Sequence, residues 1–194
     1  MKAILYDWGG ANIWLFHAIN DVRYGFLDQF MLLGTRLGEH ALFPFYMGLI
    51  TLFALHDVAT NRQKPQRWLA VIAVFCIAYL LDGLLIGTFK PLLDFPRPPL
   101  ALPQGTVHIV GMAEYHHSLP SGHSSFAMLC TASLWPVLNR YARMAGMFFV
   151  LWVGISRISL GAHFPADVLA GFLSSLAVVL LVYAAVQSYT RNRS

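Results

Sequence analysis

The sequence predicts an all-α integral membrane protein, a helical bundle with about five transmembrane helices. Composition is the first observation behind this prediction: 57% of the 194 residues are hydrophobic and only 11% are charged. Soluble domains carry about 25% charged residues. The second observation is that apolar stretches of about 20 residues, the length that crosses a bilayer, recur along the chain. Both observations argue against a soluble globular domain.

Five apolar stretches are predicted to be the transmembrane helices. They cover residues 37–56, 68–89, 121–138, 142–158 and 166–189. Pro44 falls in the first turns of the first helix, where a missing backbone N–H costs little. These spans belong to a predicted membrane-embedded domain over residues 37–190.

The segment before the first span is less apolar. Within residues 11–36, Asp21, Arg23 and Asp28 interrupt the hydrophobic side chains, and charges in hydrocarbon are costly. We therefore expect residues 1–36 to form one or two amphipathic helices that lie in the membrane interface. The alternative is that this segment forms a sixth span.

Basic residues predict the orientation in the membrane. They cluster in the connection 57–67, in the turn 139–143 and in the C-terminal tail, which five spans would place on the same side of the membrane. These basic residues are Arg62, Lys64, Arg67, Arg140, Arg143, Arg191 and Arg193. The positive-inside rule makes that side cytoplasmic. The loops 90–120 and 159–165 then share the outer face. The net charge of +4 thus reflects membrane topology, and no nucleic-acid partner is expected.

Nearly all chemically useful residues fall in or beside those outer loops. Cations occur at Lys90, Arg97 and Arg157, and Ser121 and Gly122 begin a predicted helix. Arginine pairs with phosphate in bidentate geometry, and the N–H groups at a helix start attract anions. Phosphoryl transfer mainly requires positioning and charge neutralisation. This set is suited to a phosphoryl group without a metal.

Two histidines complete the cluster. His163 and Asp167 are four residues apart and share a face if a helix begins there. The carboxylate can accept a proton from one ring nitrogen and leave the other lone pair available to attack phosphorus. His123 is then the candidate general acid for the leaving alkoxide. A phosphohistidine intermediate follows from these roles.

The order and spacing of these residues resemble a known family. Lys90-x6-Arg97-Pro98, Pro120-Ser121-Gly122-His123 and Ser156-Arg157-x5-His163-x3-Asp167 are similar to the three-part motif of the type-2 phosphatidic acid phosphatase and vanadium haloperoxidase superfamily. The resemblance implies a helical-bundle core and metal-independent hydrolysis without a cofactor. It implies a nucleophile at His163, an acid at His123, a carboxylate partner at Asp167, and phosphate binding by Lys90, Arg97, Ser121, Gly122 and Arg157.

Supporting roles are predicted for four further residues. Asp82 lies in the second span, where a carboxylate is expensive, and either pairs with Lys90 or Arg157 or hydrogen-bonds another helix. Glu39 is placed to reach a headgroup. Glu114 and His117 lie in the outer loop and are expected to shape substrate selection. No third ligand with suitable spacing accompanies the adjacent pair His116-His117, so no metal site is predicted.

The expected function is hydrolysis of a lipid phosphate or pyrophosphate. The candidate substrates are undecaprenyl pyrophosphate, phosphatidylglycerophosphate, phosphatidic acid and lipid A phosphates. Phosphotransfer from undecaprenyl pyrophosphate to another lipid is an alternative, as is a non-catalytic membrane transporter or scaffold. The haloperoxidase reading is disfavoured by the apolar spans. We expect a multi-pass protein of the bacterial cytoplasmic membrane, with its active site on the periplasmic side, membrane lipids around it and no obligate protein partner.

Overall fold

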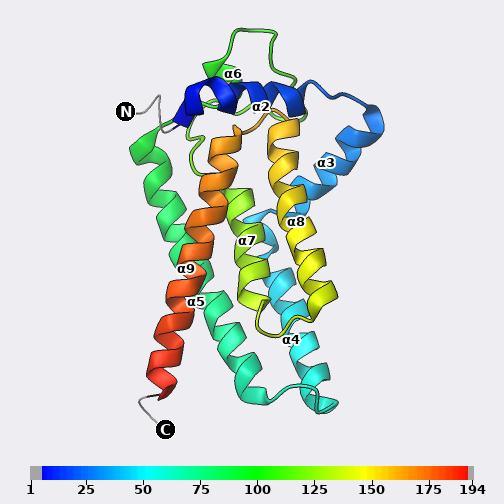
Figure 1. The fold of residues 1–194 in the computed structure, drawn as a ribbon, viewed down its shortest axis with the longest axis vertical. Coiled ribbons are helices and arrows are strands. Elements are labelled where there is room, and N and C mark those ends of the chain that lie inside the picture. Colours follow the sequence, from blue (N-terminus) through cyan, green and yellow to red (C-terminus); the bar gives the residue numbers. More distant parts are fainter. Residues whose placement is uncertain (1–5, 192–194) are drawn as a thin grey trace.

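The regular elements of the structure, a computed structural model, are all helices within the residues it describes, 6–191 (Figure 1). The elements in chain order are η1 (Trp8–Gly10), α2 (Ala11–Asn20), α3 (Gly25–Leu37), η2 (His40–Leu42), α4 (Phe43–Ala59), α5 (Pro65–Leu93), α6 (Pro98–Ala101), α7 (Gly122–Leu134), α8 (Arg140–Ser159) and α9 (Pro165–Arg191). The predicted all-α bundle is confirmed.

Four helical segments in the described part of the chain are long and apolar enough to cross a membrane. They are His40–Ala59, Pro65–Ala101, Arg140–Ser159 and Pro165–Tyr189. Large apolar side chains stand on their outward faces, for example Leu52, Leu84 and Leu181, which are 65%, 68% and 71% exposed. Such exposure is stable only when lipid covers these faces. Four of the five predicted spans are therefore present.

The predicted span 121–138 needs correction. The corresponding helix, α7, has 13 residues and is about 20 Å long at 1.5 Å per residue, too short for a hydrocarbon core of about 30 Å. It ends at Leu134, two residues before Pro136, which has no backbone N–H to continue the helix; Trp135 itself keeps helical dihedrals. Helix α7 lies inside the bundle against α5, α8 and α9. Its apolar composition reflects burial in protein.

The N-terminal segment forms two helices, α2 and α3, separated by residues 21–24. They have 10 and 13 residues, so neither is long enough for the alternative of a sixth span. Figure 1 shows α2 lying across the upper ends of α8 and α9, while α3 packs along α8. Their placement in the membrane interface, and the division of the chain at residue 36, stay predictions.

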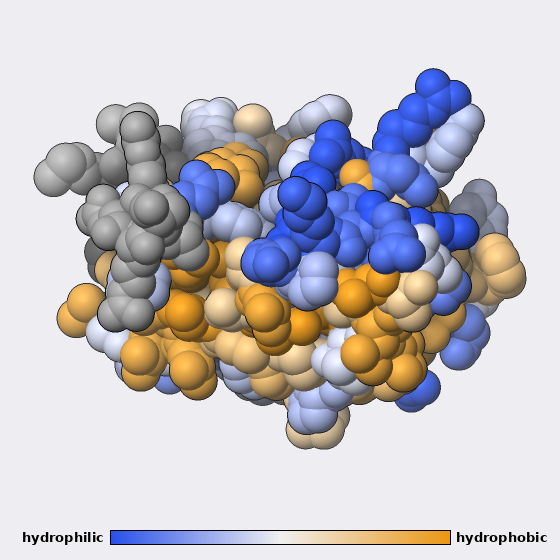
Figure 2. Space-filling model, turned by 90° about the horizontal axis from the view of Figure 1, so that it is seen from below, coloured by the Kyte–Doolittle hydropathy of each residue, from blue (hydrophilic) through white to orange (hydrophobic). Residues whose placement is uncertain are grey.

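The basic connections and the long outer loops lie at opposite ends of the bundle, as the sequence predicts. The connections after α4 and α7 and the C-terminal end of α9 lie at the lower end in Figure 1, and the loops before α7 and α9 lie at the upper end. Figure 2 shows hydrophilic residues gathered on the lower end beside hydrophobic surface. Arg62, Arg67 and Arg140 are exposed in these lower connections. Arg193 lies outside the described residues, and the cytoplasmic assignment stays a prediction.

The core and the upper end meet where α9 passes the start of α7. Buried apolar side chains from α5, α7 and α9 form the main core, including Val71, Phe75, Phe126, Leu129 and Val179. Above this core, a Cβ atom on Gly171 would lie 2.5 Å from the Ser121 carbonyl oxygen. Glycine therefore permits a close helix contact, as small residues do in membrane bundles. The Ser121 N–H donates to the Asp167 carbonyl oxygen at 3.0 Å.

We predict that Gly171→Ala lowers stability and activity together, because the new methyl group forces α9 away from α7. Overpacking of this kind costs about 1–3 kcal/mol. The thermal unfolding midpoint in detergent is the measurement. The matched control is Gly83→Ala on α5, where an added Cβ meets nothing within 4 Å and alanine favours the helix. Equal midpoints for the two variants would contradict the prediction.

Candidate active site

The Asp167 carboxylate is the centre of a buried polar cluster at the upper end of the bundle. It lies in the first turn of α9 and is 0% exposed. The Ser118 hydroxyl and the Phe164 N–H donate to Oδ2 at 2.5 and 2.8 Å, and the Tyr6 hydroxyl donates to Oδ1 at 2.7 Å. The positive end of the helix dipole also stabilises a carboxylate at this position. Asp167 is thus fixed as a hydrogen-bond acceptor.

His163 lies directly before α9 and faces Asp167 on one side and Arg97 on the other. Its Nδ1 is 3.3 Å from Asp167 Oδ2, and its Nε2 is 3.2 Å from Arg97 Nη1. Because a guanidinium has no acceptor, Nε2 must carry the lone pair and Nδ1 the proton. Burial, together with the charges of Arg157, Arg97 and Lys90, lowers the pKa of His163 well below 6.5. The ring is therefore neutral, with its Nε2 lone pair directed at the cations.

Arg97 is held by loop carbonyls and by one carboxylate. Its Nε donates to the His116 carbonyl at 2.9 Å, and Nη1 donates to the Ala162 carbonyl at 3.2 Å. Nη1 also pairs with Glu114 Oε2 at 2.5 Å. Arg97 is 7% exposed at its side chain and Glu114 is 54% exposed. The carbonyls fix the guanidinium, and Glu114 is the partner that an incoming anion can replace.

Arg157 is a buried cation with an unused donor. It lies in the last turn of α8 and is 8% exposed. Its Nη1 donates to Thr35 Oγ1 at 2.7 Å, whereas its Nε has no hydrogen-bond partner among the described residues. A buried donor without an acceptor costs free energy. An anion beside Arg157 would remove that cost.

A cavity of 550 Å³ lies beside Arg157. The lining residues include His123, Glu39 and Glu114. Within the described residues, the His123 ring has no hydrogen-bond or ion-pair partner, so it is available to a molecule in the cavity. His163 does not line the cavity and is 1% exposed. Arg97 contacts both the cavity-lining Glu114 and the His163 Nε2 atom, and so connects the cavity to the imidazole.

The phosphate-binding residues predicted at the start of α7 lie at the same end of the bundle. The Ser121 hydroxyl is buried and accepts a hydrogen bond from Ser124 Oγ at 2.9 Å. The backbone N–H of Ser121 donates to the backbone carbonyl of Asp167. The N–H groups of Gly122 and His123 lie in the first turn of α7, where helix geometry supplies no intrahelical acceptor. Lys90 is half-buried in the last turn of α5, and its charge acts on His163.

The supporting residues separate into two groups. Asp82 accepts the Ser125 hydroxyl at 2.6 and 2.7 Å and lies 3.7 Å from His40 Nε2. It thus follows the predicted alternative of a hydrogen bond to another helix, and it does not pair with Lys90 or Arg157. Glu39 and Glu114 line the cavity, as described.

His117 belongs to neither arrangement at the cavity. Its Nδ1 lies 3.1 Å from Asp94 Oδ1 and 3.2 Å from the Lys90 carbonyl oxygen, and it is not among the residues that line the cavity. It connects the outer loop to the end of α5 instead. An effect on substrate selection would have to act through that loop.

Sequence reasoning missed three residues that touch this cluster. Ser118 hydrogen-bonds Asp167, Thr35 hydrogen-bonds Arg157, and Tyr6 hydrogen-bonds Asp167 across 161 positions of sequence. The nearness of Ser118 to Pro120-Ser121-Gly122-His123 was a usable signal. Tyr6 and Thr35 lie in no motif, and only the path of the chain brings them to the site.

Known proteins resemble this chain in sequence and fold. It is 30% identical over 118 residues to the lipid A 1-phosphatase of Rhizobium johnstonii, covering 58% of this chain and 47% of that protein. It is 37% identical over 116 residues to phosphatidylglycerophosphatase B of Bacillus subtilis, covering 52% and 51%. The matched region is thus about half the length of each of these two relatives.

A solved structure gives the same arrangement of helices. The structure of Aquifex aeolicus LpxE superimposes with a TM-score of 0.72 at 22% identity and covers 89% of this chain and 94% of that one. At this identity the likeness concerns the fold. The match to the PAP2 superfamily extends over residues 67–191 and takes in every residue of the cluster from Lys90 to Asp167. Since that is most of the chain, the chain belongs to the PAP2 superfamily.

Proposed function

We propose that this protein is a lipid phosphate or pyrophosphate phosphatase that works through a phosphohistidine at His163. The observation that carries the proposal is the orientation of this imidazole. Its Nδ1 faces the Asp167 carboxylate and its Nε2 faces a group of cations. A neutral histidine with a directed lone pair is a nucleophile, and the cations are suited to the oxygens of a phosphoryl group.

In the first step, Nε2 of His163 attacks phosphorus after the phosphoryl group has taken the place of Glu114 on Arg97. The N–P bond forms while the bond from phosphorus to the leaving oxygen breaks. Burial and the charge of Arg157 lower the pKa of the His123 imidazole to about 2. The bound phosphoryl anion offsets both the Arg157 and the Lys90 charges, so we propose that His123 takes up a proton when substrate binds and donates it to the lipid alkoxide as that oxygen leaves. Arg97, Arg157 and Lys90 neutralise the three remaining phosphoryl oxygens, and Asp167 stabilises the positive charge on the imidazole.

In the second step, water enters and the now neutral His123 takes one of its protons. The hydroxide attacks phosphorus, the N–P bond breaks, and inorganic phosphate leaves while His163 returns to its neutral form. Both steps use the same cations. Because these cations supply the charge neutralisation that phosphoryl transfer requires, we expect no need for a metal.

The substrate class follows from the surroundings of the cavity. The polar site lies at the upper end of helices whose outward faces are apolar. A phosphorylated headgroup can therefore enter the cavity while its acyl or prenyl tail stays in lipid. With the basic connections in the cytoplasm, the site faces the outer leaflet. The proposed location is the bacterial cytoplasmic membrane, with the active site on its periplasmic side.

The decisive experiment measures inorganic phosphate release by the purified protein in detergent, with and without EDTA. The panel contains undecaprenyl pyrophosphate, phosphatidylglycerophosphate, phosphatidic acid and a lipid A phosphate. We predict release that EDTA does not reduce and that His163→Ala and Arg157→Ala abolish. His17→Ala is the matched control, because His17 lies on α2 and pairs with Asp21 outside the cluster.

Other outcomes identify the alternatives. If the protein releases no phosphate alone but transfers it to an added acceptor lipid, and His163→Ala removes the transfer, the protein is a phosphotransferase. If wild-type protein binds the lipids without either reaction, the proposal is wrong and a transporter or scaffold is favoured. The order of rates across the panel identifies the preferred lipid.

Glu114→Gln tests the exchange of partners at Arg97. Removing this carboxylate leaves Arg97 without a competing anion, so we predict that vanadate, a phosphate analogue, inhibits about fivefold more strongly. That factor corresponds to ~1 kcal/mol, the upper range for a partly exposed ion pair. Asp94→Asn removes the same charge from the neighbouring pair with His117 and should change inhibition less than twofold. Weaker inhibition of Glu114→Gln would mean that Glu114 positions Arg97.

Asp82→Asn tests the polar contact between α5 and α7. The amide retains only one acceptor for Ser125, whose hydroxyl now faces both carboxylate oxygens. We predict a two- to tenfold fall in kcat, in line with about 1 kcal/mol for a weakened hydrogen bond, with normal membrane insertion. Membrane fractionation and the rate on the best lipid are the measurements. Wild-type rates in this variant would remove Asp82 from the supporting residues.

A further inference from the structure

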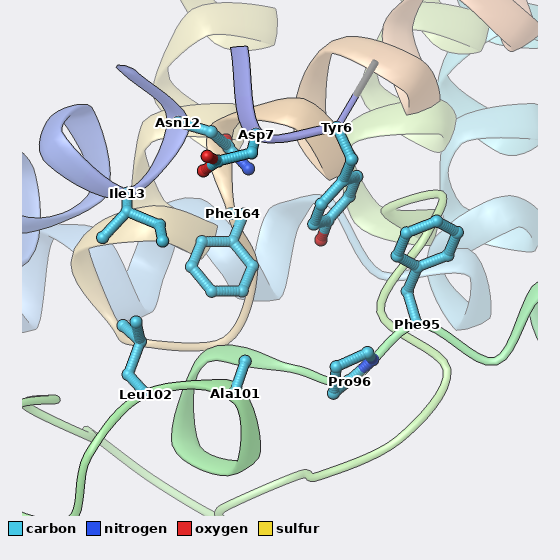
Figure 3. Close-up of a pocket in the computed structure, with 9 residues that line it drawn as sticks. All are labelled: Tyr6, Asp7, Asn12, Ile13, Phe95, Pro96, Ala101, Leu102 and Phe164. Carbon is cyan, nitrogen blue, oxygen red and sulfur yellow. The ribbon is translucent and has the colours of Figure 1, made fainter. Parts of the chain in front are cut away.

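The N-terminal segment supplies a hydrogen bond to the catalytic cluster from outside the region that matches the family. The Tyr6 hydroxyl donates to Asp167 Oδ1 at 2.7 Å, while the family match begins at residue 67. Figure 3 shows Tyr6 together with Phe95 and Phe164 at the wall of a cavity of 280 Å³. This cavity is separate from the one that His123 and Arg157 line.

The Tyr6 ring is held in place by aromatic packing. Its centroid lies 4.5 Å from that of Phe95 and 6.0 Å from that of Phe164, which it meets edge-on. Such pairs add stability beyond the buried area. Burial and the negative charge of Asp167 raise the pKa of Tyr6, so the hydroxyl keeps its proton and remains a donor. The contact is therefore a directed hydrogen bond from a fixed side chain.

The same segment also binds the backbone on both sides of His163. Asn12 Oδ1 accepts the Ala166 N–H at 2.9 Å, and Asn20 Nδ2 donates to the Ser159 carbonyl at 2.9 Å. These asparagines are 1% and 0% exposed. Buried polar side chains that meet their partners fix a backbone more firmly than exposed ones do. Helix α2 thus holds the connection from α8 to α9 at both ends.

The two Asp167 oxygens divide the available donors unequally. Oδ2 accepts hydrogen bonds from the Ser118 hydroxyl and the Phe164 N–H, and it faces His163 Nδ1. Tyr6 is the donor that the described residues offer to Oδ1. A carboxylate with donors on both oxygens cannot rotate about its Cβ–Cγ bond without breaking one of these bonds. Tyr6 therefore fixes the rotation that directs Oδ2 at His163.

We propose that Tyr6 is a positioning residue for the Asp167–His163 pair, so that the catalytic unit of this protein includes its N-terminal segment. This inference rests on the proposed function, because it assigns Tyr6 a part in the same reaction. Tyr6 itself does not touch the substrate. It acts through the orientation and charge of Asp167, which in turn hold the imidazole of His163.

The test compares Tyr6→Phe with Tyr24→Phe in the full-length protein on the preferred lipid. Both changes remove one hydroxyl, but Tyr24 is 71% exposed and does not contact the cluster. We expect Tyr6→Phe to lower kcat about tenfold, as loss of a hydrogen bond to a charged group does, with KM changed less than twofold. Tyr24→Phe should match the wild-type protein in both constants.

The pH profile distinguishes positioning from a general loss of structure. Without the Tyr6 donor, Asp167 keeps more negative charge for His163, which raises the basicity of the imidazole. His163 is then protonated, and lost as a nucleophile, at a higher pH than in the wild-type protein. The acid limb of the kcat/KM profile should therefore move to higher pH in Tyr6→Phe, and it should not move in Tyr24→Phe.

The outcomes separate this inference from the proposed function. Wild-type kcat and an unmoved acid limb in Tyr6→Phe would overturn the role of Tyr6 while the phosphatase stands. No phosphate release by the wild-type protein would overturn the proposed function instead. If Tyr6→Phe lowers the thermal midpoint, Tyr6→Leu, which also loses the hydroxyl, gives a second comparison. A fall in kcat that follows the midpoint across both variants, with no pH shift, would contradict positioning.

Discussion

The hydrogen bonding of the buried Asp167 carboxylate is the constraint on which the rest of the site depends. A buried charge is tolerated only when donors satisfy it, and these donors come from three distant parts of the chain. Tyr6 belongs to the N-terminal segment, Ser118 to the outer loop, and the Phe164 N–H to the start of α9. Satisfying this one side chain therefore brings together the segments that surround His163. The His163 ring acquires its tautomer and orientation from its contacts with Asp167 and Arg97.

The cations of the site impose a second constraint, which concerns what the protein binds. Arg97 and Arg157 are nearly buried, and Glu114 satisfies only part of their charge. Positive charge that is held in a pocket of low dielectric attracts anions strongly, and among the described residues the buried Arg157 Nε has no hydrogen-bond partner. The same burial keeps His163 neutral. In the proposed function, affinity for phosphate and activation of His163 thus have one physical origin, the removal of the cluster from water.

The sequence predicted most of the architecture because lipid leaves few alternatives. Four spans and the two-sided distribution of loops follow from apolar length and from basic residues. The prediction of a transmembrane helix over residues 121–138 is wrong because it rests on hydropathy alone. A helix buried in protein and a helix buried in lipid have similar compositions, and hydropathy does not distinguish the two environments. Only the packing of α7 against α5, α8 and α9 shows which environment surrounds it.

The sequence by itself determined the helical class, the membrane location and the identities of the residues that form the charged cluster. These properties depend on local composition and on short spacings, such as the four residues from His163 to Asp167. Tertiary structure alone decided that Tyr6 and Thr35 reach the cluster. It also decided that Asp82 accepts a hydrogen bond from Ser125 and that Glu114 forms an ion pair with Arg97. Each of these contacts joins distant segments. Such contacts depend on how the helices pack, and no local pattern in the sequence encodes that packing.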